Sequence, residues 1–194
     1  MKGGQTVEKL VSPELYVAVP TIQAISYSMN SKELRSLYAN LLAKAMHKDH
    51  ASKVHPSYVE IIKQLSPQDA LIFSEIASKE FRPFMKVFMQ FYNTRSMKLF
   101  LKNATWIQRP IADVDLSIDN LARLGLLNLD TEYFYEQEEY SSVRNNPYYI
   151  QALKDAESVL DTQIFKNFKH EFGAILLPTL GGNFYRICVL DKLE

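Results

Sequence analysis

One apolar stripe between Leu34 and Met46 constrains the fold of this chain more than any other feature of its sequence. Apolar side chains recur there at i, i+3, i+4, i+7, i+8, i+11 and i+12, namely Leu34, Leu37, Tyr38, Leu41, Leu42, Ala45 and Met46. At 3.6 residues per turn, this spacing predicts a helix with one apolar face that must be buried. The other face would carry Arg35, Asn40, Lys44 and His47. We therefore expect the helix to form an outer wall of a water-soluble core.

Helix start signals lie on both sides of this stripe. Ser12-Pro13 places a capping hydroxyl before a proline at the first helical position, which predicts a helix from there to Tyr27 with a kink at Pro20. Ser31 is the expected cap of the striped helix, and Pro56 is the expected start of the next one. The positions expected to be buried in that third helix are Val59, Ile62 and Leu65.

A fourth start signal follows at Ser66-Pro67, where Asp69 lies three residues after the serine, as in a capping box. The inner positions expected in this helix are Ile72, Phe73, Ile76 and Ala77. The residues from 81 to 106 fit two interpretations, because their aromatic residues have a helical spacing while Met85, Val87 and Met89 alternate as in a strand. We favour a β-hairpin with its turn at Asn93 to Ser96.

Three further helices are predicted in the second half of the chain. One runs from about Ser117 to Leu127 and is loosened near its end by Gly125. Another begins at Asn146-Pro147. Its expected inner positions are Ile150, Leu153, Leu160 and Ile164. A short strand from Glu171 to Leu177 precedes the last helix. That helix should open at Pro178 and Thr179 and bury Phe184, Ile187 and Cys188.

The resulting fold class is mainly α with small β elements, an α+β protein. The order of the helices at 65–77 and 117–127, an extended segment at 129–135 and the strand at 171–177 is similar to that of winged-helix domains. We expect N-terminal helices at 1–54 and a winged-helix-like part at 55–194 with insertions, one of them hairpin-like and near 80–110, all packed as one compact unit. The segments that separate the two helices, and those that separate the two strands, are longer than ordinary hairpin loops.

Composition restricts the compartment and the partners. Lysine plus arginine and aspartate plus glutamate number 22 each, so no net charge attracts the whole chain to nucleic acid or an anionic membrane. Cys188 is the only cysteine, which excludes an internal disulfide and favours the reducing cytoplasm. We find neither a signal peptide nor an apolar run long enough for a membrane span. The Gly3-Gly4 pair suggests that an N-terminal portion of the natural protein is missing.

Charge is nevertheless unevenly distributed along the chain. Between residues 79 and 109 the basic residues are Lys79, Arg82, Lys86, Arg95, Lys98, Lys102 and Arg109, against Glu80 alone. Interleaved aromatic residues would allow this basic segment to follow a single-stranded nucleic acid by charge and stacking. The candidate contacts are Arg82, Lys86, Arg95, Lys98 and Lys102. The alternative that we favour is that the aromatic residues are core and that the basic segment neutralises an acidic one.

The acidic segment lies between Ile111 and Tyr140 and contains eight carboxylates against one base, Arg123. Such a charge repels phosphate, so we do not expect the helix at 117–127 to enter a DNA groove. The segment also contains a candidate protein-binding loop at Tyr133, Tyr135, Glu138 and Glu139. A solvated surface loop without a partner explains the same residues equally well.

Three smaller constellations suggest chemistry, and for each a structural explanation is stronger. His47, Asp49, His50 and His55 include metal-ligand types but match no zinc spacing. Cys188 and His170 could form a nucleophilic pair, although the cysteine lies on an apolar helix face. Gly181-Gly182 would suit a phosphate loop, yet no lysine follows it. We assign no catalytic residue, cofactor or metal, and expect that the chain is not an enzyme.

Several motifs resemble the bacterial Abi-alpha (abortive infection alpha) family, formerly a domain of unknown function. The motifs are Ala39-Asn40-Leu41, His55-Pro56, Leu65-Ser66-Pro67, the segment LARLGLL at 121–127, and Thr179, Gly182, Phe184 and Cys188 near the end. The resemblance covers most of the chain. It implies a role in abortive infection or other phage defence, without an established enzymatic activity or catalytic residues.

We therefore expect a non-enzymatic protein-binding module of bacterial phage defence or toxin immunity, located in the cytoplasm. The alternative is a nucleic-acid-binding winged-helix regulator that uses the basic segment at 79–109. A metal-dependent hydrolase or nuclease at the histidine cluster is the third possibility. The sequence does not determine the protein partner or the oligomeric state.

Overall fold

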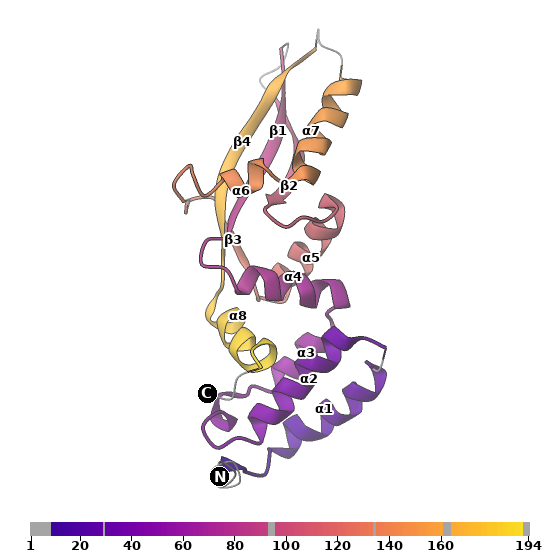
Figure 1. The fold of residues 1–194 in the computed structure, drawn as a ribbon, viewed down its shortest axis with the longest axis vertical. Coiled ribbons are helices and arrows are strands. Elements are labelled where there is room, and N and C mark those ends of the chain that lie inside the picture. Colours follow the sequence, from indigo (N-terminus) through magenta and orange to yellow (C-terminus); the bar gives the residue numbers. More distant parts are fainter. Residues whose placement is uncertain (1–8, 29, 93–95, 134, 161–163, 192–194) are drawn as a thin grey trace, which may run out of the picture. The chain divides into compact units, whose positions relative to one another are not determined.

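The computed structural model describes residues 9–28, 30–92, 96–133, 135–160 and 164–191 (Figure 1). The turn expected at Asn93 to Ser96 and the Gly3-Gly4 pair lie outside these ranges, except for Ser96. The chain forms two compact units. Unit 1 combines residues 1–77, 124–126 and 178–194, and unit 2 combines residues 78–123 and 127–177. The expected boundary near residue 54 stays a prediction.

Unit 1 is helical. Its helices are α1 (Leu15–Tyr27), α2 (Lys32–Ala45), the 3₁₀ turn η2 (Ala51–Lys53), α3 (Ser57–Lys63), α4 (Pro67–Ala77), α8 (Thr179–Phe184) and the π-helical turn η3 (Tyr185–Val189). α1, α2 and α3 pack against one another, and η3 packs against α2 (Figure 1). The apolar stripe of α2 supplies the centre of this unit, since Leu37, Tyr38, Leu41 and Ala45 are all buried.

Side-chain caps begin two of these helices as the sequence predicted. The Ser31 hydroxyl accepts a hydrogen bond from the Leu34 amide at 3.2 Å. At the start of α4, the Ser66 amide donates to the Asp69 carboxylate at 2.8 Å, and the Asp69 amide donates to the Ser66 hydroxyl at 3.0 Å. This reciprocal pair is the expected capping box, and it satisfies amides that have no partner within the helix.

The prediction for the start of α1 was wrong by two residues. The helix begins at Leu15, after Glu14 in an extended conformation, and Ser12 forms no side-chain cap. Pro20 lies inside α1, as expected. At the next residue, the buried Thr21 hydroxyl donates to the Val17 carbonyl at 2.7 Å, which lets a polar side chain occupy the inner face of the helix.

The largest correction in unit 1 concerns Lys44, which the stripe placed on the solvent face. Its side chain is instead buried, with 2% exposed area. Its ammonium donates hydrogen bonds to the Arg186 carbonyl, at 2.5 Å, and to the Leu190 carbonyl. One turn earlier on α2, the Asn40 amide donates to the Cys188 carbonyl at 3.0 Å. Both side chains therefore donate to backbone carbonyls of η3 and of Leu190, the residue that follows it.

Gly181 and Gly182 have different structural roles. A Cβ atom on Gly181 would lie 2.1 Å from the Leu126 carbonyl oxygen, so the backbone of α8 packs directly on the segment at 124–126. A Cβ atom on Gly182 would have no neighbour within 4 Å. The close approach explains the first glycine without any phosphate site, and α8 has only 6 residues.

Unit 2 is built on a four-stranded antiparallel sheet. Its strands are β1 (Pro83–Phe91), β2 (Met97–Thr105), β3 (Asn128–Asp130) and β4 (Phe165–Leu176), in the order β2-β1-β4-β3. β1 and β2 confirm the hairpin interpretation of residues 81–106. β4 begins at Phe165, earlier than the expected Glu171.

Three helices complete unit 2: α5 (Ile111–Arg123), α6 (Ser141–Arg144) and α7 (Pro147–Val159). Tyr140, Val143 and Tyr149 pack on Met85 and Val87 of β1 in one buried cluster. The Tyr140 hydroxyl donates to the Gly173 carbonyl at 3.0 Å, and this fixes the chain before α6 on the central strand β4.

Several predicted bounds and inner positions in unit 2 were wrong. α5 begins at Ile111 and ends at Arg123, whereas we expected 117–127; Gly125 follows it with a positive φ of 72°. Asn146 caps α7 as expected, by accepting from the Tyr148 amide at 3.0 Å. However, Tyr149 is buried and Ile150 is exposed, so the helix is rotated from the predicted face. Ile164 is exposed and precedes β4.

The two strands of the expected wing do pair. β3 lies antiparallel to β4, with Leu129 opposite Ile175. β4 also pairs along most of its length with β1, from Pro83 opposite Ala174 to Phe91 opposite Phe165. The pair is therefore the edge of a larger sheet. The fold is α+β, and the winged-helix arrangement stays a prediction.

Replacement of Gly181 by alanine should destabilise unit 1 by about 1–3 kcal/mol, because the methyl group collides with backbone that cannot rotate away. Gly182→Ala is the matched control and should be neutral or stabilising, since alanine favours helix. Urea unfolding monitored by circular dichroism, together with the rate of Cys188 modification by a thiol reagent, would measure both. Equal stability of the two variants would contradict the packing role.

Replacement of Lys44 by methionine should expose the buried Cys188 to thiol reagents and lower the free energy of unfolding. The two carbonyls that Lys44 serves would lose their donor, and each unsatisfied buried group costs about 1–3 kcal/mol. Lys48→Met, at an exposed lysine near the end of the same helix, is the control. An unchanged modification rate in Lys44→Met would show that the ammonium is dispensable.

Candidate functional site

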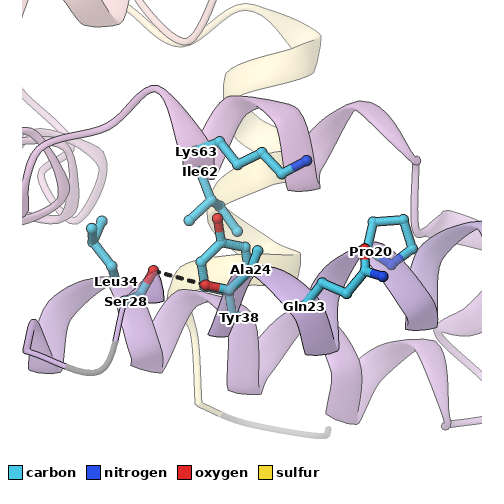
Figure 2. Close-up of a pocket in the computed structure, with 8 residues that line it drawn as sticks. All are labelled: Pro20, Gln23, Ala24, Ser28, Leu34, Tyr38, Ile62 and Lys63. Carbon is cyan, nitrogen blue, oxygen red and sulfur yellow. Dashed lines mark hydrogen bonds between the residues drawn. The ribbon is translucent and has the colours of Figure 1, made fainter. Parts of the chain in front are cut away.

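A cavity of about 480 Å³ lies between α1, α2 and α3 of unit 1 (Figure 2). Its lining residues are Pro20, Gln23, Ala24, Ser28, Leu34, Tyr38, Ile62 and Lys63. Half of this lining is apolar, and the other half supplies hydroxyl, amide and ammonium groups. A volume of this size is within the range of small-molecule pockets.

Tyr38 is the central residue of this cavity. The side chain rises from α2 with its hydroxyl toward α3 (Figure 2), and only 1% of the residue is exposed. Within the described ranges its hydroxyl makes no hydrogen bond. Burial raises the pKa of Tyr38 to about 12, and the nearby Glu60 carboxylate contributes to this shift. The hydroxyl is therefore a protonated donor at physiological pH.

Two short contacts hold other parts of the lining. The Ser28 hydroxyl donates to the Ala24 carbonyl at 3.2 Å, which is the interaction drawn in Figure 2. On α3, Lys63 pairs with Glu60 at 2.7 Å, and both side chains are substantially exposed. Exposed pairs of this type contribute little stability, so the lysine can move at low cost. The charges of Lys63 and Glu60 balance each other beside the cavity.

The outer face of α1 is the second notable surface of unit 1. Its exposed apolar side chains are Leu15 (76% exposed), Tyr16 (59%), Val19 (47%) and Ile22 (60%). The inner face of the same helix buries Val17, Ala18 and Ala24. None of its 13 residues is charged. A helix that is apolar on both sides is normally covered on both sides, so this outer face has the character of a binding surface.

Two lysines of the basic segment form ion pairs within unit 2. Lys86 binds Glu171 on the neighbouring strand at 2.7 Å, and Lys102 binds Asp119 of α5 at 2.7 Å. The second pair joins the basic segment to the acidic one, and the neutralisation of one whole segment by the other stays a prediction. Lys98 is exposed on β2, and Arg82 takes part in contacts of its own. Arg95 lies outside the described residues, and a nucleic-acid role for the segment stays a prediction.

The acidic and aromatic loop is partly incorporated into the fold. Tyr133 is half exposed and meets Tyr135 edge to face, with ring centroids 5.6 Å apart. Tyr135 in turn meets Phe81 at 5.5 Å, and its amide donates to the buried Tyr140 hydroxyl. Glu138 is exposed, and Glu139 lines a hollow of about 320 Å³ beside Phe81. The protein-binding role of these residues stays a prediction.

The histidine cluster is brought together only in part. The rings of His47 and His50 lie 5.0 Å apart, and Asp49 is bound to Lys9 at 3.0 Å. His55 is positioned elsewhere, where its ring accepts from the Ser57 amide at 3.1 Å. In the part of the chain that the structure describes, no three histidine, cysteine, aspartate or glutamate residues are arranged to hold a metal ion.

Cys188 and His170 belong to different units and have different surroundings. Burial raises the pKa of the Cys188 thiol well above its usual value, which disfavours the nucleophilic thiolate. Burial lowers the pKa of His170, with a smaller contribution from the Arg144 charge. The His170 ring is hydrogen-bonded to the Tyr149 hydroxyl at 2.8 Å. His170 thus has a structural partner in Tyr149, and the Cys188 thiol is buried in the core of unit 1.

The sequence-based reasoning missed both surfaces of unit 1. The outer face of α1 had a readable signal, because residues 15–27 contain no charge and their apolar residues are not confined to one side. The cavity had none, since Tyr38 and Ile62 were correctly predicted as core. Only the packing of three helices shows that the space beside them is not filled.

The fold and its surfaces define an α+β protein with an exposed apolar helix face and a small cavity. Among the described residues, no helix is long and apolar enough to cross a membrane. The profile of the abortive infection alpha family matches residues 2–188, which is almost the whole chain. The chain therefore belongs to the abortive infection alpha family, and membership suggests a role related to abortive infection. Neither the curated proteins nor the solved structures compared with it include a match.

We expect no binding of labelled single-stranded or duplex oligonucleotides to persist at physiological salt, because Lys86 and Lys102 are already paired with carboxylates. Fluorescence anisotropy at low and physiological salt would measure this. Saturable binding at physiological salt that is lost in a Lys86→Glu, Lys98→Glu double variant would contradict the expectation and support a nucleic-acid surface.

Proposed function

We propose that this chain is a non-enzymatic protein-binding module of bacterial phage defence that binds its partner through the outer face of α1. Family membership supports the biological context. The observation that carries the molecular role is the exposed, uncharged and apolar face formed by Leu15, Tyr16, Val19 and Ile22.

Burial of this face would provide a substantial part of a binding energy. A large apolar side chain taken fully out of water contributes about 1.5–3 kcal/mol, and four such side chains lie on one helix. Their spacing, at positions 15, 19 and 22 with Tyr16 beside them, follows the i, i+4, i+7 pattern of helix recognition. The inner face of α1 is held by unit 1, so the outer face is presented on a fixed support.

The chemistry of this face selects the partner. Because α1 contains no charged residue, a charged partner surface would lose its hydration without gaining an ion pair. A partner that presents an apolar helix stripe or groove would lose no such hydration. We propose that the partner is a different protein with such an apolar stripe or groove. Binding of this partner to the outer face of α1 would link its recognition to the defence response.

The test compares infected cells that carry the wild-type gene with cells that carry a Val19→Glu, Ile22→Glu double variant. Both positions are exposed, so the variant should accumulate as folded protein while the apolar face gains two charges. We expect the wild type to reduce phage plaque formation and the variant to lose at least tenfold of that protection. Ala43→Glu, at an exposed position of α2, is the matched control and should keep full protection.

A photoreactive amino acid in place of Tyr16 would identify what covers the face during infection. A cross-linked product that contains the chain and a second, different protein, and that is lost in the double variant, would support a heterologous partner. A product with the mass of two copies would instead show self-association. Absence of protection by the wild type against a broad phage panel would contradict the defence role.

A further inference from the structure

We propose that the cavity between α1, α2 and α3 is a binding site for a neutral small molecule with an apolar or aromatic body and one hydrogen-bond acceptor, which the Tyr38 hydroxyl binds. The site is distinct from the outer face of α1 and does not depend on the proposed protein partner. It rests on the size, lining and unused donor of the cavity (Figure 2).

The size and the walls determine the body of the ligand. A volume of about 480 Å³ is large enough for a ligand with one or two rings. Ala24, Leu34 and Ile62 supply apolar walls from three different helices, so a flat or branched apolar group would be in contact on several sides. Filling the space with apolar atoms gains dispersion contacts that the lining now lacks.

The unused hydroxyl determines the polar group. Tyr38 is almost completely buried, yet its hydroxyl makes no hydrogen bond to another described residue and borders the cavity. A phenol hydroxyl without an acceptor in the surrounding described residues is free to donate to water or to a ligand in the cavity. Because the hydroxyl remains protonated, with a pKa of about 12, it is available as a donor. A carbonyl or ether oxygen is the matching acceptor.

The charge beside the cavity favours a neutral ligand over an anion. Lys63, the one cationic residue of the lining, is bound to Glu60 at 2.7 Å. Glu60 also lies close enough to Tyr38 to affect its titration. Because the charges of Lys63 and Glu60 balance each other, a carboxylate ligand would find no net positive charge beside the donor. It would lose its own hydration on burial, and a neutral acceptor avoids this cost.

The experiment uses acetophenone and ethylbenzene, two probes of similar shape that differ in the carbonyl oxygen. The full chain, labelled at the isoleucine methyl groups, would be titrated with each probe while the NMR shift of the Ile62 methyl is followed. We expect both probes to shift this methyl and acetophenone to bind about three- to tenfold more tightly, as one hydrogen bond allows. Tyr38→Phe should remove the difference between the probes and keep the binding of ethylbenzene.

A second variant tests the location independently of Tyr38. Leu34 is only partly buried, so Leu34→Trp should fill the cavity without disturbing the core, and it should abolish the shifts caused by both probes. Ala43→Trp, at an exposed site on the same helix, is the control and should leave them unchanged. The proposal is overturned if neither probe shifts the Ile62 methyl at millimolar concentration, or if acetophenone has no advantage over ethylbenzene in the wild type.

Discussion

The hydrogen bonds from Lys44 and Asn40 to the end of η3 are the interaction on which unit 1 depends. They join two segments that are more than 140 residues apart in the sequence. A buried ammonium is costly to desolvate, and burial accordingly lowers the pKa of Lys44. The carbonyls at the end of a helix carry partial negative charge, and a cation at this position is favourable. The Lys44 side chain therefore provides a donor for two backbone carbonyls and joins the C-terminal helix to α2.

Local signals in the sequence predicted most helix starts correctly. Ser31, the Ser66 and Asp69 pair and Asn146 all cap helices through hydrogen bonds within a few residues, so neighbouring residues contain the whole interaction. The burial of Ile72, Phe73 and Ile76 was predictable for the same reason, since a periodic stripe reports one helix face. The hairpin of β1 and β2 followed from alternation.

The errors occurred where distant residues decide the outcome. Lys44 has the spacing of a solvent-facing residue, and only the carbonyls of residues 186 and 190 make its burial favourable. The face of α7 is chosen by the sheet cluster that receives Tyr149, and a pattern within the helix does not show this. Of the candidate site, Tyr38 and Ile62 were predicted as buried residues, but the space between the helices is a property of their packing.

The close contact between Gly181 and Leu126 has a consequence for biosynthesis. Unit 1 draws its parts from residues 1–77, 124–126 and 178–191, while the residues between them build the sheet of unit 2. On the ribosome, the N-terminal helices emerge long before α8 and η3, so Lys44 and the stripe of α2 lack their final partners during most of translation. Contacts between such distant segments form slowly. Until they form, the incomplete chain exposes apolar surface, which favours aggregation. A nascent chain of this topology would benefit from chaperone protection until its last helix is synthesised.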